Sequence, residues 1–381
     1  MKFLKKQLLL LYLIANATAE YVSLMFASKY LFYAVLALSI PIIISKNVFA
    51  KNIRVQCPQM YFMMAIYLIA QFVLQADLIN NQTLTYTIGK VVTFCIMMFC
   101  ISHNFDYYFK QTIRPLSYII LGLLLVGWFI NKGEIGGDDY ITFGFANRNA
   151  ACTLGSIGFA GFLFTSKKYS FKEYLFMAFL LLTILIGGSR NALAMCLLFI
   201  IVRYGLSGKL VFASLACIFF IVYVLPEFGL EAVALDRLEG TLSGTVSLDR
   251  EDQREAAKWM IMQRPWTGWG YNHENIGYAL ALTEYGAHNG YLTTMKNLGI
   301  PLGIMLLVTI LWTSLKNLRL YKLHNMEINY HLAVVVSILL AANFEDFLVG
   351  VNQITTNIFF LSFVVLNIYR YRYGYNNNKR H

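Results

Sequence analysis

Long apolar runs separated by short polar segments form the dominant pattern of this chain. Leu116–Ile130 and Leu175–Ile186 contain no charged residue, and other runs approach the ~20 residues that cross a bilayer as a helix. The runs are continuously apolar rather than alternating, and backbone in lipid must satisfy its own hydrogen bonds, so the pattern predicts helices and excludes a β-barrel. Twelve spans are predicted, centred near Ile14, Leu36, Ile66, Cys95, Leu124, Gly155, Phe179, Cys196, Ile218, Leu306, Val336 and Leu361.

Basic residues recur at the amino terminus and then after every second predicted span. The clusters hold 20 of the 31 Lys and Arg residues and lie at 2–6, 46–54, 110–114, 167–172, 203–209, 316–322 and 370–380. Positive charge stays on the cytoplasmic side of a membrane, so the recurrence of basic clusters after every second span predicts that both termini are cytoplasmic. It divides the chain into helices one to nine (1–226), a long external loop (227–287), and helices ten to twelve with a basic tail (288–381).

Composition agrees with a membrane protein, since 58% of residues are hydrophobic and 13% are charged, against about 25% charged in soluble domains. The net charge of +11 is mainly on the predicted inner face, beside anionic lipid. Lys5-Lys6, the apolar segment 8–15 and Ala17-Thr18-Ala19 also fit a cleavable secretory signal. We favour a retained first helix, and either interpretation leaves the remaining topology unchanged.

Several function classes lack sequence support. The chain contains no Walker loop, no C-x-x-C pair and no H-E-x-x-H motif, so we expect no cofactor, no metal site and no nucleic-acid partner. It also shows no internal repeat and no proline in the middle of a predicted span, which argues against a transporter.

Polar residues gather at two predicted external ends of helices. Arg148 and Asn149 would open the sixth span, where free backbone N–H groups favour an anion; an interfacial Arg with helix-capping Asn residues is the alternative. Arg190 lies in the tight connection 187–193 between spans seven and eight. A guanidinium at the bilayer boundary needs a partner, and Arg suits phosphate, although a snorkelling Arg is the alternative.

The long external loop contains a predicted helix over Leu248–Met262, with Arg250, Arg254 and Lys258 along one stripe. A solvated helix whose cations pair with neighbouring acids is the alternative. The loop ends at His288, directly before an apolar helix. A neutral imidazole there could accept a proton near neutral pH, whereas most single His residues are structural.

Taken in order, these motifs resemble the O-antigen polymerase and O-antigen ligase superfamily of bacterial surface-polysaccharide assembly. The resemblance covers about residues 140–310 and adds to the twelve-span layout. It rests on Phe143-x-x-x-Asn147-x-Asn149, on Ser189-Arg190-Asn191-Ala192, on Arg250 fifteen residues before Pro265-x-x-Gly268-x-Gly270, and on His288-Asn289-Gly290-Tyr291-Leu292. The family commonly has Trp four residues after the loop Arg, where this chain has Arg254, so the roles of Arg250 and Arg254 are partly interchangeable.

The resemblance implies an all-α integral membrane glycosyltransferase with a GT-C-like architecture, in the bacterial inner membrane with its active face periplasmic. Such an enzyme takes a glycan from undecaprenyl diphosphate and transfers it to an acceptor glycolipid. His288 would be the general base, and Arg190 and Arg250 would stabilise the diphosphate leaving group without a metal ion, with inversion at the anomeric carbon. The remaining candidates would bind substrate: Arg254, Arg148, Asn149, Asn289 and Tyr291.

Three functions remain open at this point. A polymerase of O-antigen or capsule would transfer the glycan to another lipid-linked repeat unit, and a ligase would transfer it to lipid A-core; the short chain without an extra domain favours the polymerase. A lipid-linked glycan flippase would place charges along a path inside its spans, whereas these charges cluster at one face. A flippase and a chain-length regulator are expected as partners of either enzyme.

Overall fold

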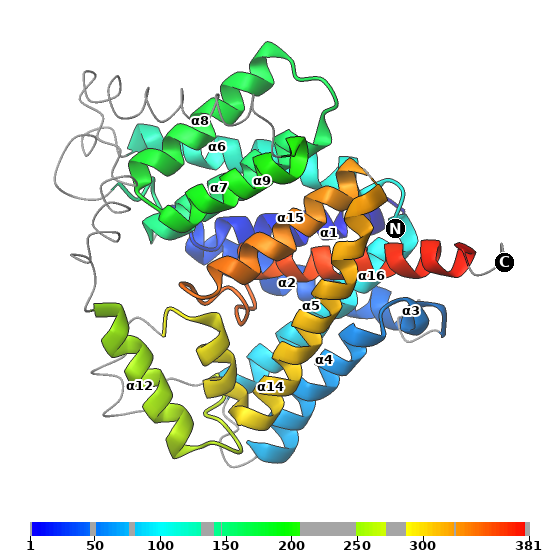
Figure 1. The fold of residues 1–381 in the computed structure, drawn as a ribbon, viewed down its shortest axis with the longest axis vertical. Helices are drawn as coiled ribbons and strands as arrows, with labels where there is room; N and C mark the ends of the chain where they lie inside the picture. The colour runs from blue at the N-terminus through cyan, green and yellow to red at the C-terminus, as the bar shows by residue number, and fades with distance from the viewer. Residues whose placement is uncertain are drawn as a thin grey trace.

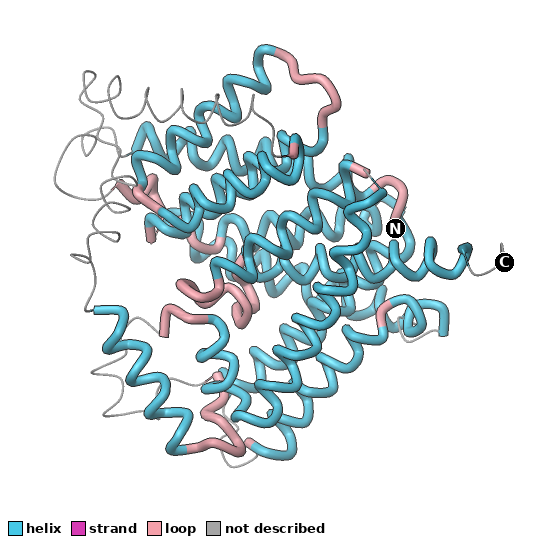
Figure 2. The backbone as a smooth tube through the Cα atoms, in the orientation of Figure 1, coloured by secondary structure: helices cyan, strands magenta, loops and turns pink. Residues whose placement is uncertain are grey.

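The computed structural model describes residues 2–45, 51–75, 81–130, 141–145, 147–205, 249–271, 287–323 and 325–377. The secondary structure of these residues is helical, without strands (Figures 1 and 2). The α-helices are α1 (Lys2–Thr18), α2 (Met25–Ser45), α3 (Lys51–Gln56), α4 (Pro58–Ile69), α5 (Asn81–Asn104), α6 (Arg114–Ile130), α7 (Arg148–Thr165), α8 (Phe171–Gly187), α9 (Arg190–Tyr204), α12 (Asp249–Gln263), α14 (Gly290–Leu318), α15 (Met326–Ala341) and α16 (Ile354–Asn377). Short 3₁₀ or π segments are η1 (Val22–Leu24), η2 (Ala70–Leu74), η4 (Phe109–Ile113) and η8 (Arg319–Leu323).

Several of these helices are long and apolar enough to cross a membrane, so the chain is a multi-pass membrane protein. Five segments qualify by length and composition, namely Val22–Pro41, Thr83–Asn104, Phe109–Ile130, Gly290–Tyr321 and Ile354–Tyr373. Shorter apolar helices cover Gln7–Thr18, Pro58–Leu74 and Met326–Ala341, and α7, α8 and α9 contain three further predicted centres. The predicted centre Ile218 lies outside the described residues. Twelve spans and the external position of the loop therefore stay predictions.

Helix α7 is deeply packed, and its first residues lie at the candidate site described below. It lies against α6, α8, α9 and α15, and its residues from Ala151 to Phe164 are all buried. Small residues permit this close packing: a Cβ added at Gly158 would lie 2.9 Å from Cγ2 of Ile120. Helices α6 to α9 thus form one group in Figure 1, joined through α15 to α16 and through α6 to α1.

Helix α14 is broken, which corrects the expectation that no proline interrupts a span. Pro301 has no N–H to donate and its ring clashes with the carbonyl four residues earlier, that of Asn297. At the break Gly299 adopts φ +76°. The segment after α12 bonds to the freed groups: Trp269 N donates to Lys296 O at 2.9 Å, Gly270 N to Asn297 O at 3.0 Å, and Ile300 N to Pro265 O at 2.7 Å. The loop helix α12 is therefore anchored to α14.

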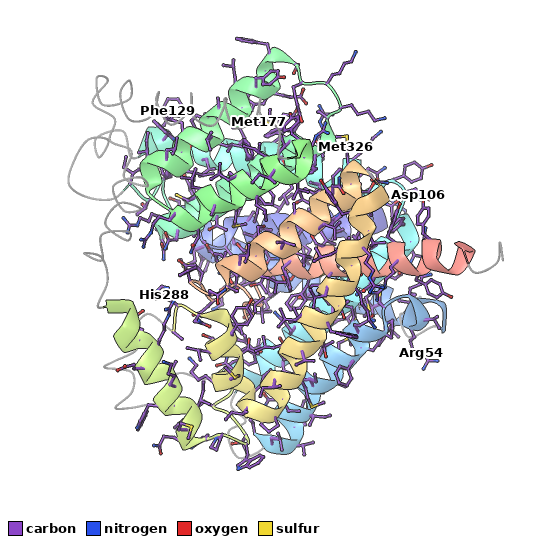
Figure 3. All side chains as sticks on the ribbon, in the orientation of Figure 1. Arg54, Asp106, Phe129, Met177, His288 and Met326 are labelled. Carbon is purple, nitrogen blue, oxygen red and sulfur yellow. The ribbon has the colours of Figure 1, made fainter. Side chains whose placement is uncertain are left out.

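The two ends of the bundle differ in what they carry. The start of α1 and the end of α16 lie at one end of the bundle (Figure 1), and Figure 3 shows Arg54, Asp106 and Met326 there as well. His288 and α12 lie at the opposite end. This is the arrangement that the charge pattern requires, because the predicted cytoplasmic segments share one end of the molecule.

Candidate functional site

Asparagine caps set where two of the site helices begin. The side chain of Asn147 accepts a hydrogen bond from Asn149 N at 2.8 Å and caps α7. The side chain of Asn289 accepts from Tyr291 N at 3.1 Å and from Leu292 N at 3.0 Å, and caps α14. Asn is among the best residues at this position because its oxygen satisfies N–H groups that lack an intrahelical partner. The caps place Asn149 and His288 at fixed points at the same end of the bundle.

A buried carboxylate joins these two residues. Glu345, in the loop after α15, is 8% exposed. Its Oε2 lies 3.4 Å from His288 Nδ1, and its Oε1 accepts a hydrogen bond from Asn149 Nδ2 at 3.0 Å. Asn149 and His288, which the sequence predicted separately as site residues, therefore both contact Glu345, which it did not predict. The available signal was the Glu345-Asp346 pair in a predicted external loop of a chain with few charges.

The backbone at His288 is unusual for a residue with a side chain. Its φ is +43°, a left-handed conformation that costs about 1–3 kcal/mol and that clusters at functional sites. Backbone contacts two residues later hold this part of the chain in place: Gly290 N donates to Ala342 O at 2.8 Å and to Glu345 O at 3.1 Å. The loop that contains Glu345 thus holds the start of α14 through backbone carbonyl groups as well as through the Glu345 carboxylate.

The loop helix reaches the same place through Arg254. Its Nη2 donates to Asn343 O at 2.8 Å, and Asn289 Nδ2 donates to the same carbonyl oxygen at 3.2 Å. The guanidinium carbon of Arg254 lies 5.8 Å from the centre of the Phe344 ring. Its buried Nε has no hydrogen-bond partner within the described part of the chain, so a donor beside the site remains available.

Asp346 performs a supporting task one residue after Glu345. It accepts from Asn289 N at 3.1 Å and from the Thr293 hydroxyl at 2.7 Å, and it interacts electrostatically with the buried Lys296. These contacts tie the first turn of α14 to the loop after α15. Asp346 therefore orients the helix that presents His288, whereas Glu345 contacts the imidazole itself.

The other predicted site residues are placed less directly. Arg148 and Arg190 open α7 and α9, which pack against each other and begin at the same end of the bundle. Arg250 lies in the first turn of α12, but its side chain is outside what the structure describes. Tyr291 donates its hydroxyl to Leu339 O at 2.7 Å, so here it ties α14 to α15.

The arrangement of His288 and Glu345 suits proton transfer at the imidazole, next to a bound anion. A carboxylate at His288 Nδ1 favours the tautomer whose proton lies on that nitrogen, which leaves Nε2 as an acceptor. Helix N-termini at α7, α9 and α14 add partial positive charge at this end. Within the described residues, no group of three or more His, Cys, Asp or Glu residues could hold a metal ion.

Comparison with known proteins indicates the class of protein that this chain resembles. Residues 175–307 match a family model described as O-antigen ligase, and this segment contains α9, α12 and the start of α14. The match confirms the resemblance to the O-antigen polymerase and ligase superfamily, whose members are glycosyltransferase-like enzymes that act on lipid-linked glycans in a membrane. No curated protein matches the chain. Asn149 and Glu345 lie outside the matched segment, so only the structure connects them to it.

Proposed function

We propose that this protein is an inverting, metal-independent glycosyltransferase of surface-polysaccharide assembly. It takes glycan repeat units from undecaprenyl diphosphate at the periplasmic face of the inner membrane. One observation supports this proposal above all: His288 and Asn149 converge on the buried Glu345, with Arg254 bonded to the same loop. A base held by a carboxylate next to cations is what acceptor activation and diphosphate departure need.

In the proposed reaction, Nε2 of His288 takes the proton of the acceptor hydroxyl. The acceptor oxygen attacks the anomeric carbon and forms the new glycosidic bond. The bond from that carbon to the diphosphate oxygen breaks, and its electron pair leaves with the diphosphate. Arg190, Arg250 and Arg254 stabilise the negative charge that develops there, with Arg148 in support. A single displacement of this kind inverts the anomeric centre.

Polymerisation of O-antigen or capsular repeat units is the first assignment. Ligation of the glycan to lipid A-core is the second, and one observation favours it: the matched family model carries the ligase description. The product distinguishes the two, because a polymerase makes a ladder of repeat units on the carrier lipid, whereas a ligase attaches glycan to lipid A-core. A flippase would move the lipid-linked glycan without making either product.

The test is transfer by the purified full chain in proteoliposomes that contain the lipid-linked repeat unit, with and without lipid A-core. We expect the wild-type protein to form product at its full rate in the presence of EDTA. The transfer rate of His288→Ala and of Arg190→Ala should be about 10²–10⁴-fold lower, which is the range for loss of a general base or of a charge-stabilising group. Lys168→Ala is the control, since Lys168 is exposed in the α7–α8 connection. Full rates in folded His288→Ala and Arg190→Ala proteins would contradict the proposal.

A further inference from the structure

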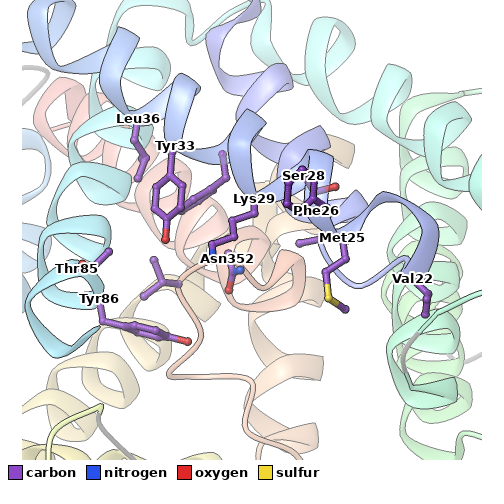
Figure 4. A pocket seen from close by; sticks show the side chains of 13 residues that line it. Val22, Met25, Phe26, Ser28, Lys29, Tyr33, Leu36, Thr85, Tyr86 and Asn352 are labelled. Carbon is purple, nitrogen blue, oxygen red and sulfur yellow. The ribbon is translucent and has the colours of Figure 1, made fainter. Parts of the chain in front are cut away.

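A pocket of about 480 Å³ lies between α2 and α5 (Figure 4). This volume is within the usual range for small-molecule sites, about 300–1,000 Å³. Most of its wall is apolar, including Val22, Met25, Phe26, Phe32, Leu36 and Val351. A groove of this composition suits a hydrocarbon chain better than a sugar.

The pocket opens on the outer side of the bundle. Helix α2 packs mainly against α1 and α5, and its pocket-lining Met25 and Phe26 are 47% and 74% exposed. Val22–Pro41 is also a candidate membrane span. Exposed side chains of this kind face lipid in a membrane protein, so the mouth of the pocket faces the bilayer and admits a lipid from the side.

Two contacts connect the pocket to the candidate site. Val351 and Asn352 in its wall belong to the connection between α15 and α16 that also carries Glu345. Tyr86, also in its wall, stacks at 5.1 Å on Tyr271, which ends the segment that anchors α12 to α14. The wall of the pocket therefore shares one segment with the candidate site and contacts the segment that anchors α12.

The wall near Val351 is firmly held. Lys90 Nζ, on a buried side chain, donates to Gly350 O at 2.7 Å, and Asn357 Nδ2 donates to Val351 O at 2.7 Å. A pocket with a wall fixed in this way exists before a ligand arrives, which lowers the ordering cost of binding.

One cation lines the otherwise apolar wall. Lys29 points toward Asn352 in Figure 4, and its side chain is exposed. An ammonium group and an amide beside a hydrocarbon groove match an amphiphile with an anionic headgroup. A lipid diphosphate has this chemistry, and its apolar part is a branched isoprenoid chain.

We propose that this pocket holds the isoprenoid chain of the lipid-linked donor, in the part nearest the diphosphate. The inference rests on the proposed function, since it gives the donor's lipid a place relative to the site. A bulk phospholipid is the competing occupant, but nothing would tie it to the loop of Glu345.

Photolabelling tests the proposal with the full chain in nanodiscs and a polyisoprenyl diphosphate whose chain carries a diazirine. We expect labelled peptides from residues 22–36 and 85–86. Ser28→Trp should reduce this labelling at least tenfold, because Ser28 is buried in the wall and an indole would fill the pocket. Leu38→Trp is the matched control, since Leu38 is on the same helix, 54% exposed and not part of the wall.

Lys29→Gln provides a second variant that keeps the packing, and it should weaken labelling several-fold. In transfer assays Ser28→Trp should raise KM for the lipid-linked donor about tenfold, whereas Leu38→Trp should leave this KM unchanged. Labelling elsewhere, equal competition by a phospholipid, or unchanged labelling of folded Ser28→Trp and Lys29→Gln proteins would overturn the proposal.

Labelling requires no turnover, so the two proposals can fail separately. A wild-type protein that is labelled in the pocket but forms no glycan product would contradict the proposed function and leave chain binding intact. A protein that makes product while its label maps elsewhere would contradict the pocket alone.

Discussion

Glu345 concentrates the chemistry of the site in one side chain. A buried carboxylate loses its hydration and remains charged only where donors replace the lost water. Asn149 Nδ2 contacts one of its oxygens at 3.0 Å, and His288 Nδ1 lies 3.4 Å from the other. This distance to the imidazole is at the long end for a hydrogen bond, as is common in catalytic pairs before substrate binds. The contact with Asn149 leaves the second oxygen directed at His288.

Glu345→Gln tests this role with little change in shape. The amide cannot stabilise the imidazolium that forms when His288 takes a proton, so kcat should fall about 10²–10⁴-fold while KM for donor stays within a few-fold. Steady-state transfer assays measure both constants. Glu327→Gln is the control, because Glu327 lies in the first turn of α15, at the opposite end of that helix. An unchanged kcat in Glu345→Gln would remove Glu345 from the mechanism.

The sequence predicted some residues of this cluster and missed Glu345, for a physical reason. Asn149, Arg254 and His288 lie within recognisable motifs or at predicted helix starts, which local pattern reveals. Glu345 is 57 residues from His288 and 196 from Asn149, so its role depends on how α7, α14 and α15 pack. Periodicity fixes where helices lie along a chain, but not which of their ends touch.

At the scale of elements, the break in α14 couples the loop helix to the bundle. A continuous helix would use the carbonyls of Lys296 and Asn297 internally; here they accept from Trp269 N and Gly270 N. Gln75 Nε2 also donates to Asn297 O at 2.6 Å and to Thr267 O at 2.8 Å. The docked segment ties α12, with Arg254, to the helix that His288 precedes.

Gly299→Ala should loosen this docking. A Cβ at Gly299 would lie 2.5 Å from Trp266 O and would be strained by the φ of +76°, so we expect a cost of about 1–3 kcal/mol. The expected results are faster proteolysis between residues 264 and 287 and a lower rate of transfer. Gly122→Ala is the matched control, since a Cβ there meets nothing within 4 Å. Equal protection in the two variants would show that the break does not hold the loop.

The sequence predicted the loop helix well and the break poorly. Leu248–Met262 was expected and Asp249–Gln263 is observed, because an uninterrupted run of helix-forming residues defines α12. Pro301 gave a weaker signal, since proline is well tolerated near the start of a helix. The break becomes apparent only with the partner segment, which lies about thirty residues earlier and supplies the replacement hydrogen bonds.

At the scale of the whole molecule, the two ends of the bundle carry different segments. One end carries the start of α1, the end of α16 and the predicted cytoplasmic segments, and the other carries His288, α12 and the loop of Glu345 (Figures 1 and 3). Inverting the protein would place the basic clusters outside, against the retention of positive charge in the cytoplasm. The site would also face the wrong compartment for the periplasmic donor of the proposed function.

Cysteine labelling in spheroplasts of the source cells measures this orientation directly. Asn343→Cys lies in the exposed loop beside the site, and Lys168→Cys lies in the exposed α7–α8 connection at the other end. The five native cysteines within the described residues are buried and should react slowly, and the protein without either new cysteine measures the background. A membrane-impermeant maleimide should label position 343 in intact spheroplasts and position 168 only after permeabilisation, because a charged reagent does not cross the bilayer. The reverse pattern would place His288 in the cytoplasm, where a periplasmic transfer reaction could not use it.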